Sequence, residues 1–292
     1  MPCAFVAALV LIYALWPEPK VALAPPLPSP NGYDDFVKAG TLLAFTAADY
    51  RRMPKEDLEA YVSTNQEPLR LVRLGLTREC QVPMDVSWEQ VRTNWEGRSG
   101  VSRLTLLIAA EGRLAELEKR FSDAARAHLD NVRFGQRSAT GGRIIDKFKG
   151  VAFETIGMMG LERIVDRLDT AEVVRECITT LETADARSTP ASDYINRDRQ
   201  WYRKATRSSD KIRAMWVNKT LFPDRAADQA LITKLHIADR RRRQLLLNLA
   251  ARAYELERGK KPVRAEDLVP SVLRTLPKDP ETGTNLVLNP VP

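Results

Sequence analysis

Hydrophobic residues recur at helical spacing through most of the chain. Between Gly32 and Pro262 no stretch alternates apolar and polar residues long enough to predict a strand. Two segments, 101–121 and 144–165, each carry a stripe of apolar residues three or four positions apart, as amphipathic helices do. The stripes contain Leu104, Leu107, Ile108, Leu114, Leu117 and Phe121, and then Ile144, Phe148, Val151, Ala152, Ile156, Met159 and Val165.

Residues that favour helix ends divide this pattern into separate helices. Ser122 and Asp123 predict a break before a returning helix over 124–138. Asp169 and Glu172 have the spacing of a capping box, which would open a helix at about residue 171. The final helix is predicted over 225–257, ended by Gly259.

Short connections between amphipathic helices predict antiparallel helical hairpins packed into a bundle. The segment from Ala110 to Gly142 has the size and small-residue placement of a tetratricopeptide-like hairpin, although no second copy follows at a fixed period. Gly157 and Gly160, three positions apart, predict close approach between helices. The predicted fold class is therefore all-α.

The chain closes with a segment divided by prolines. Gly259 should end the long helix, and Pro262, Pro270 and Pro277 should each mark a boundary because proline donates no backbone hydrogen bond. Residues 265–269 predict a single helical turn, and 284–288 is the best strand candidate. We expect this segment to wrap back over the long helix as a Pro-rich C-terminal module.

The first sixteen residues, MPCAFVAALVLIYALW, carry no charged side chain and precede a Pro-rich spacer. Sixteen helical residues span about 24 Å, short of the ~30 Å hydrocarbon core of a bilayer. A membrane anchor is the favoured interpretation, and a signal peptide or a buried core helix are the alternatives. Lys20, Lys38, Arg51 and Arg52 follow the run, which by the positive-inside tendency favours a cytoplasmic body.

The formal charge of +7 is concentrated in one segment. Residues 197–243 contain fourteen Lys or Arg against five Asp, a net of +9, so the rest of the chain carries −2. The side chains predicted to bind anions are Arg199, Arg203, Lys204, Arg207, Lys211, Arg213, Arg240, Arg241 and Arg243, with Trp201, Tyr202 and Trp216 as stacking groups. We call residues 197–243 the basic strip.

The basic strip has three interpretations. Aromatic and cationic residues together suit single-stranded nucleic acid, where bases stack and phosphates pair. They equally suit a membrane surface with anionic lipid. The third interpretation is an amphipathic, internally paired helical surface, in which Arg242 falls on the apolar stripe and is buried or paired.

Residue chemistry argues against several activities. Cys3, Cys80 and Cys177 form no C-x-x-C pair, and the two histidines, His128 and His236, are far apart, so no metal site or disulfide framework is predicted. The phosphate-cradling, dinucleotide, nucleophile-elbow and zinc-protease motifs are absent from the sequence. No catalytic residue, cofactor or metal ligand is predicted, and a carboxylate pair formed by distant residues is the remaining route to catalysis.

The C-terminal stretch resembles a segment of the form LYxLExGxxPxxxxDLVPxxLxxLPxDPxTG. This resemblance is to uncharacterised, membrane-anchored helical proteins of planctomycete-type bacteria, and the last forty or so residues are similar to the C-terminal segment of type II secretion pseudopilins. The matching residues are Tyr254, Leu256, Gly259, Pro262, Asp267, Leu268, Val269, Pro270, Leu273, Pro277, Asp279, Pro280 and Gly283. The segments 28–40 and around Gly141 also resemble the first group. The resemblance implies an envelope-associated helical protein and favours an extracytoplasmic body.

Together these features predict an anchor and linker over 1–32, a helical domain over 33–244 and a C-terminal module over 245–292. The leading hypothesis is a non-catalytic, membrane-anchored interaction protein of the cell envelope with a protein partner. One alternative is a binder of anionic lipid or nucleic acid through the basic strip. The other is an envelope enzyme with a carboxylate site that the sequence does not locate.

Overall fold

The computed structural model describes residues 26–44, 49–84, 95–205 and 225–288. Nine α-helices and two 3-10 turns make up its regular structure, and the described residues contain no β-strand. The helices are α2 (Gly32–Thr41), α3 (Lys55–Thr64), α4 (Gln66–Thr77), α6 (Trp95–Leu117), α7 (Phe121–Arg137), α8 (Ile144–Ile164), α9 (Ala171–Ala186), α10 (Ala191–Ala205) and α12 (Arg225–Arg258). The 3-10 turns are η1 (Val165–Arg167) and η3 (Ala265–Leu268). The predicted all-α class is confirmed.

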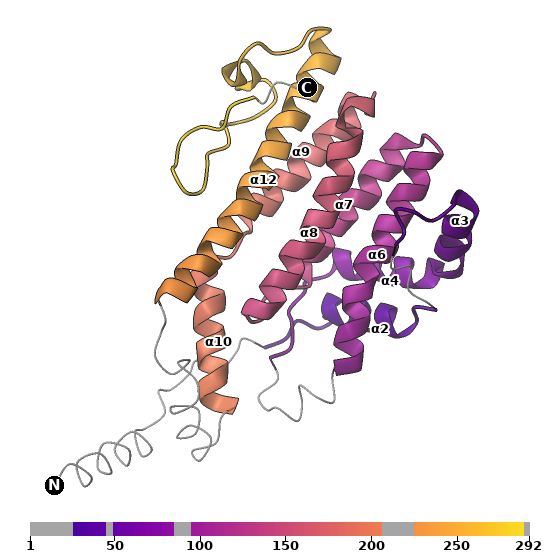
Figure 1. Ribbon diagram of the computed structural model, residues 1–292, viewed down its shortest axis with the longest axis vertical. Helices are drawn as coiled ribbons and strands as arrows, with labels where there is room; N and C mark the ends of the chain where they lie inside the picture. Colours follow the sequence, from indigo (N-terminus) through magenta and orange to yellow (C-terminus); the bar gives the residue numbers. More distant parts are fainter. Residues whose placement is uncertain (1–25, 45–48, 85–94, 206–224, 289–292) are drawn as a thin grey trace, which may run out of the picture.

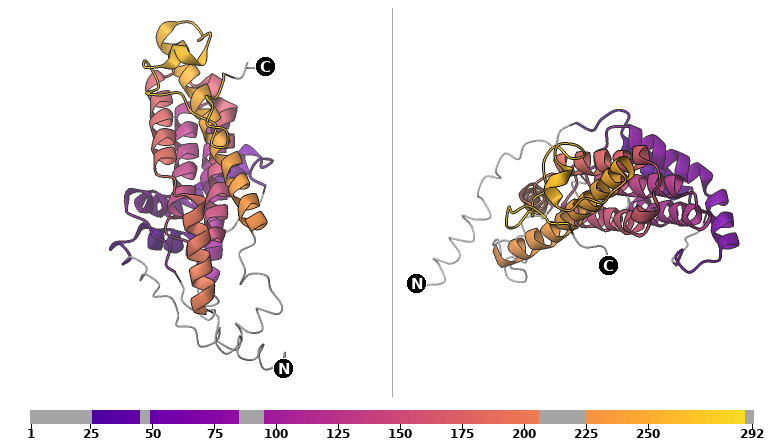
Figure 2. Two further views of the ribbon diagram at one scale, coloured as in Figure 1. Left: turned by 90° about the vertical axis from the view of Figure 1, so that its left-hand side faces the viewer. Right: turned by 90° about the horizontal axis from the view of Figure 1, so that it is seen from above.

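The helices pack in two rows. α2, α6, α8 and α12 follow one another in the first row, and α4, α7 and α9 form the second row against it (Figure 1). Connections of three to six residues join α6 to α7, α7 to α8 and α8 to α9, so these neighbours run antiparallel, as predicted. Two further views show the rows side by side and α10 extending from one end of the bundle (Figure 2).

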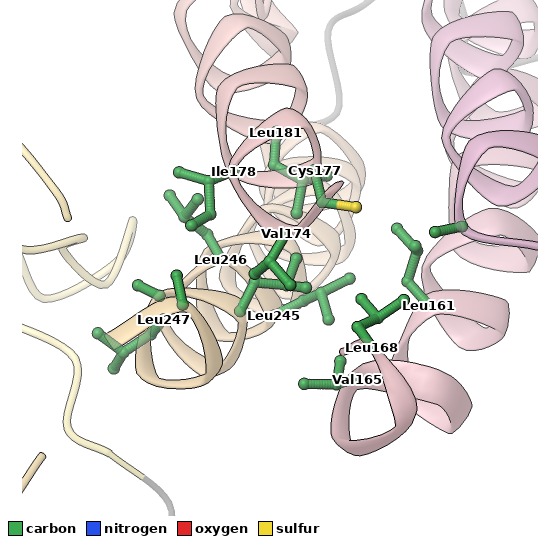
Figure 3. Close-up of a cluster of buried hydrophobic side chains, with 14 of the residues drawn as sticks. Leu161, Val165, Leu168, Val174, Cys177, Ile178, Leu181, Leu245, Leu246 and Leu247 are labelled. Carbon is green, nitrogen blue, oxygen red and sulfur yellow. The ribbon is translucent and has the colours of Figure 1, made fainter. Parts of the chain in front are cut away.

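The core has two parts. The first surrounds α2, α3, α4 and α6 and is centred on aromatic contacts, with the Phe134 ring 4.9 Å from Phe36 and 5.6 Å from Phe153. The second lies among α7, α8, α9, α12 and the C-terminal segment, and it is almost entirely aliphatic (Figure 3). There Leu245 and Leu246 of α12 face Val174, Cys177 and Ile178 of α9. Removing such side chains from water, at about 25 cal/mol per Å² of apolar surface, is what holds the rows together.

Gly157 and Gly160 behave as the sequence predicts. A Cβ atom added at Gly157 would lie 2.6 Å from the backbone oxygen of His128, and one added at Gly160 would overlap the His128 ring. α8 can therefore approach α7 this closely only with glycine at both positions.

Four local predictions were wrong. The buried face of α8 contains Phe153, Met158 and Leu161, whereas the predicted stripe, apart from Val165, is partly or fully exposed. α6 ends at Leu117 and α7 begins at Phe121, so the break precedes Ser122 and Asp123, because Lys119 turns the chain with φ +59°. The Asp169–Glu172 capping box does not form, since α9 is capped by Thr170 without a side-chain hydrogen bond. Residues 284–288 make no strand, because Lys278 and Asn285 meet only in an isolated antiparallel bridge.

The segment after Gly259 returns along α12. Gly259 has φ +69°, as a left-handed helix end requires, and η3 forms the predicted helical turn. Leu268 and Leu273 are buried in the aliphatic part of the core. Whether this segment is a separate module stays a prediction, as does the division of the chain into three parts.

No helix in the described ranges combines the length and the apolar character that crossing a membrane requires. The predicted anchor, residues 1–16, lies outside the described residues.

Candidate functional site

A groove of about 720 Å³ opens on the face of the α6–α7 hairpin, between α3 and α4 on one side and α9 on the other. Its apolar lining residues are Val62, Leu114, Ala115 and Ala127, which are largely buried. The rest of the lining is charged, and Ser63 and Gln66 are uncharged polar members. We call it the charged groove.

The amphipathic pattern of α7 explains why charges gather there. Asp123, Arg126, Asp130 and Arg133 lie three or four positions apart and share one helix face, which lines the groove. The opposite face of α7 contains Ala124, Ala125, Leu129 and Val132, all buried in the core. Burial of this apolar face fixes the polar face toward the groove.

One half of the groove is bridged by arginines of α4 and α7. Arg73 Nη2 lies 2.5 Å from Glu111 Oε2, and Arg73 Nε lies 3.3 Å from Asp130 Oδ2. Arg133 Nη1 lies 3.3 Å from Asp130 Oδ1, and Arg133 Nη2 lies 3.8 Å from Glu176 Oε1. These pairs connect α4, α6, α7 and α9.

In the other half of the groove, arginines again alternate with carboxylates. Arg126 lies 3.5 Å from Glu176 and 3.6 Å from Asp123. Arg120 lies 2.6 Å from Asp123 and 2.5 Å from Glu118.

Lys55 ends the series, 3.5 Å from Glu118 and 3.2 Å from Glu59. The resulting chain from Glu111 to Glu59 joins six carboxylates through five cations, a net of −1. We call it the ion chain.

Solvent exposure makes most links of the ion chain exchangeable. Exposed pairs of this kind contribute about 0–1 kcal/mol each, because water screens them and the long side chains lose freedom. The exception is Asp130, the most enclosed member, whose pKa is raised by burial although Arg73 and Arg133 oppose the shift. Burial lowers the pKa of Arg73, but Glu111 and Asp130 outweigh it, and the net shift is upward.

His128 lies in the same hairpin but away from the groove. Its side chain is only 1% exposed, and its Nε2 lies 2.7 Å from Glu116 Oε1. Arg163 and Arg113 also hydrogen-bond to Glu116, at 2.9 Å each. Burial alone would raise the pKa of Glu116, but the bonds from His128 and Arg163 lower it to about 2. A general base needs access to its substrate, so His128 is a structural residue that joins α6, α7 and α8.

The candidate anion-binding arginines of the basic strip whose side chains are described are paired internally. Arg199 pairs with Asp228, and Arg240 Nε lies 3.2 Å from Asp279 Oδ2. Arg241 holds Glu162 with two bonds, of 2.9 and 2.6 Å. Arg243 contacts Asp185 at 3.0 Å and donates to the Lys278 carbonyl oxygen at 2.7 Å. These arginines join α12 to α8, α9, α10 and the C-terminal segment.

The remaining candidates of the strip are residues whose side chains the structure does not describe. They are Trp201, Tyr202, Arg203, Lys204, Arg207, Lys211, Arg213 and Trp216.

Arg242 is buried and paired, as its position on the apolar stripe predicts. Its Nη1 lies 3.0 Å from Glu154, and its Nη2 lies 3.0 Å from Asp185 and 2.6 Å from Asp239. Burial disfavours the charged guanidinium, but the three carboxylates outweigh this and raise the pKa of Arg242. We call this group the Arg242 cluster, and it connects α8, α9 and α12 from inside the core.

Metal and thiol chemistry find no support. Within the described ranges no three His, Cys, Asp or Glu side chains are arranged to hold a metal ion. Burial raises the pKa of Cys80 to about 11 and that of Cys177 to about 12, which keeps both thiols protonated and unreactive near neutral pH.

The sequence did not reveal the charged groove. The spacing of Asp123, Arg126, Asp130 and Arg133 was a signal that one face of α7 is polar. The partners on other helices, such as Arg73, are 43 or more positions away, and only the fold brings them together.

No protein-family model, curated protein or solved structure matches this chain.

Proposed function

We propose that the protein is a non-catalytic helical interaction protein and that the charged groove holds an extended segment of a protein partner. The observation that carries this proposal is that apolar lining residues and the ion chain occur together in one groove of about 720 Å³. Apolar contact supplies affinity in such a site, and charges of both signs select partners and orientation.

The helical scaffold supports this proposal. The groove is lined from α3, α4, α6, α7 and α9, whose opposite faces are buried, so its shape exists before a ligand binds. A preformed site loses less conformational entropy on binding than one that must first become ordered. An ordered partner segment would exchange ion pairs of the chain, one for one, without leaving a charge unpaired.

The cellular setting belongs to the same proposal. The apolar run 1–16 and the Pro-rich spacer support a membrane anchor, and the resemblance of the C-terminal residues supports the cell envelope and a C-terminal module over 245–292. An anchored protein with a preformed groove would hold its partner at the membrane.

Selection from a displayed library of random twelve-residue peptides tests this function. The bait is the full chain, and the counter-selected bait carries Ser63→Trp, which fills the groove from an exposed lining position. Ala152→Trp, at an exposed position of α8 outside the groove, is the matched control. We expect peptides with apolar residues flanked by both charge signs, binding the wild type and the Ala152 variant but not the Ser63 variant. Peptides that bind all three proteins equally would contradict the proposal.

Catalysis is the second candidate, and one observation favours it. Asp130 in the charged groove has a raised pKa, and Glu111 lies across Arg73 from it. Two carboxyl groups on either side of an arginine, one of them enclosed, are a candidate pair for general acid–base catalysis. Asp130→Asn would abolish such an activity, whereas peptide binding would persist in that variant.

A further inference from the structure

Arg197, at the start of the basic strip, has an unusual environment on α10. Its Nε and Nη2 atoms are buried and have no hydrogen-bond partner in the described structure. Leaving a buried donor unpaired destabilises a folded protein, and more so when the group is charged. Two unpaired donors on one guanidinium therefore mark a place where a ligand would stabilise the protein.

The two unpaired atoms form one edge of the guanidinium. This protein uses the same edge to hold carboxylates elsewhere. Arg175 donates through Nε and Nη2 to Glu257 at 2.6 and 2.8 Å, and Arg241 donates to Glu162 in the same way. Two parallel N–H groups fit the two oxygens of a carboxylate or a phosphate. The Arg197 edge has that shape, and no acidic side chain of the described chain is hydrogen-bonded to it.

The surroundings add a second cation. The Arg197 guanidinium lies 4.5 Å from the centre of the Tyr194 ring, and Lys147 Nζ lies 5.6 Å from the same ring. Tyr194 and Lys147 are 3% and 8% exposed. The ring attracts both cations by cation–π interaction, so Arg197 and Lys147 both contact the same aromatic side chain.

Two of the acidic groups nearby have other partners. Glu154 interacts with Lys147 but is hydrogen-bonded to Arg242. Asp146 accepts the backbone N–H of Arg143 at 2.9 Å. Burial raises the pKa of Asp198, the acidic neighbour of Arg197 in sequence. None of these acids is hydrogen-bonded to Arg197 Nε or Nη2, which leaves this edge to an added anion.

We propose that Arg197, Lys147 and Tyr194 form a phosphate-binding site between α8 and α10, separate from the charged groove. A phosphate group would accept two hydrogen bonds from the Arg197 edge while Lys147 neutralises its second charge. Because Nε and Nη2 are covered, binding requires Arg197, which is only half-buried, to turn this edge outward while its face stays on Tyr194. Two cations suit a phosphate dianion better than a carboxylate.

Titration of the full chain with inorganic phosphate at low ionic strength tests the site. The readout is the Nε–H NMR resonance of Arg197, identified by its loss in Arg197→Lys. We expect a saturable shift of this resonance. Binding measured by calorimetry should weaken about tenfold or more in Arg197→Lys, which keeps the charge but loses the paired edge.

Arg199→Gln is the matched control, because it removes one positive charge from the same helix at a residue paired with Asp228. It should leave phosphate binding unchanged. An equal loss in the Arg197 and Arg199 variants, no saturable shift in the wild type, or equal binding of acetate would each overturn the proposal.

Vesicles distinguish the source of the phosphate. Binding to phosphatidic acid vesicles that inorganic phosphate displaces, and that Arg197→Lys weakens, identifies a lipid headgroup. Inorganic phosphate binding without vesicle binding identifies a soluble phosphate compound. Both results support the site, whereas vesicle binding that Arg197→Lys leaves unchanged shows that lipid is bound elsewhere.

Discussion

The Arg242 cluster and the ion chain of the charged groove are built from the same chemical groups in opposite environments. Arg242 is 2% exposed and has three carboxylates around it, while Arg73 has a side chain 46% exposed and bridges two. A buried charge has lost its water and depends on its partners, whereas an exposed one can return to water at little cost. Burial therefore decides which pairs hold the fold and which can be exchanged for a ligand.

Removing Arg242 should have the largest effect. Arg242→Gln leaves Glu154 buried without its cation, which we expect to lower the free energy of unfolding by about 3–5 kcal/mol. Urea denaturation at pH 7 measures this. Arg241→Gln, one position along α12, breaks an exposed pair with Glu162 and should cost about 1 kcal/mol or less. Equal decreases in the free energy of unfolding for the two variants would contradict the conclusion that burial decides how much an ion pair contributes.

A double variant tests whether the loss in Arg242→Gln comes from leaving Glu154 unpaired. Replacing both Arg242 and Glu154 with Met removes the buried charge together with its partner, so part of the stability lost in Arg242→Gln should return. If the double variant is less stable than Arg242→Gln, the Arg242 cluster stabilises the fold more than apolar side chains in its place would.

Glu116 provides an intermediate case, because it is buried but connected to partly exposed arginines. Its pKa falls from 4.5 to about 2 in the folded protein. Ionised Glu116 therefore stabilises the fold above pH 4.5, and this contribution is lost as the pH falls toward 2. The contribution is about 3 kcal/mol at ~1.4 kcal/mol per pKa unit.

Acid denaturation of Glu116→Gln should accordingly show a shallower loss of stability between pH 4.5 and 2 than the wild type. Glu118→Gln is the comparison, since Glu118 is a more exposed carboxylate near the same end of α6; Arg120 also lowers its pKa, and we expect a smaller change of slope. A wild-type slope retained in Glu116→Gln would mean that Glu116 titrates normally in the folded protein.

Arg73→Gln in the groove should have the smallest effect on stability, about 1 kcal/mol or less. Its signature is electrostatic, because Arg73 lowers the pKa of Asp130 against the effect of burial. Without Arg73 that pKa should rise further, which carboxyl ¹³C NMR across a pH series measures. Arg70→Gln, on the same helix but paired with Glu67 outside the groove, should leave the Asp130 titration unchanged.

Sequence reasoning could predict the features that depend on local spacing. The helical class, the end of α12 at Gly259, the burial of Arg242 and the close approach at Gly157 and Gly160 all follow from periodicity or from a single residue type. The break between α6 and α7 was misplaced because Lys119 adopts a left-handed conformation, which lysine rarely does.

The charged groove lay beyond sequence reasoning for a different physical reason. Arg73 and Asp130 are 57 positions apart, and Arg126 and Glu176 are 50 apart, so their pairing depends on how α4, α7 and α9 pack. For the basic strip, the sequence suggested a site that the described side chains do not form. Its arginines are conspicuous in sequence, but Arg241 and Arg243 are paired with Glu162 and Asp185, acids on α8 and α9.

Site-specific photocrosslinking in intact cells tests the central claim, that the charged groove receives a protein partner. The crosslinking residue p-benzoylphenylalanine would replace Gln66, an exposed residue of the groove lining, or Ala152, an exposed residue of α8 outside it. We expect a discrete crosslinked product from position 66. This product should be absent from position 152 and should decrease in Ser63→Trp. Equal products from both positions, or a product from position 66 that Ser63→Trp leaves unchanged, would contradict it.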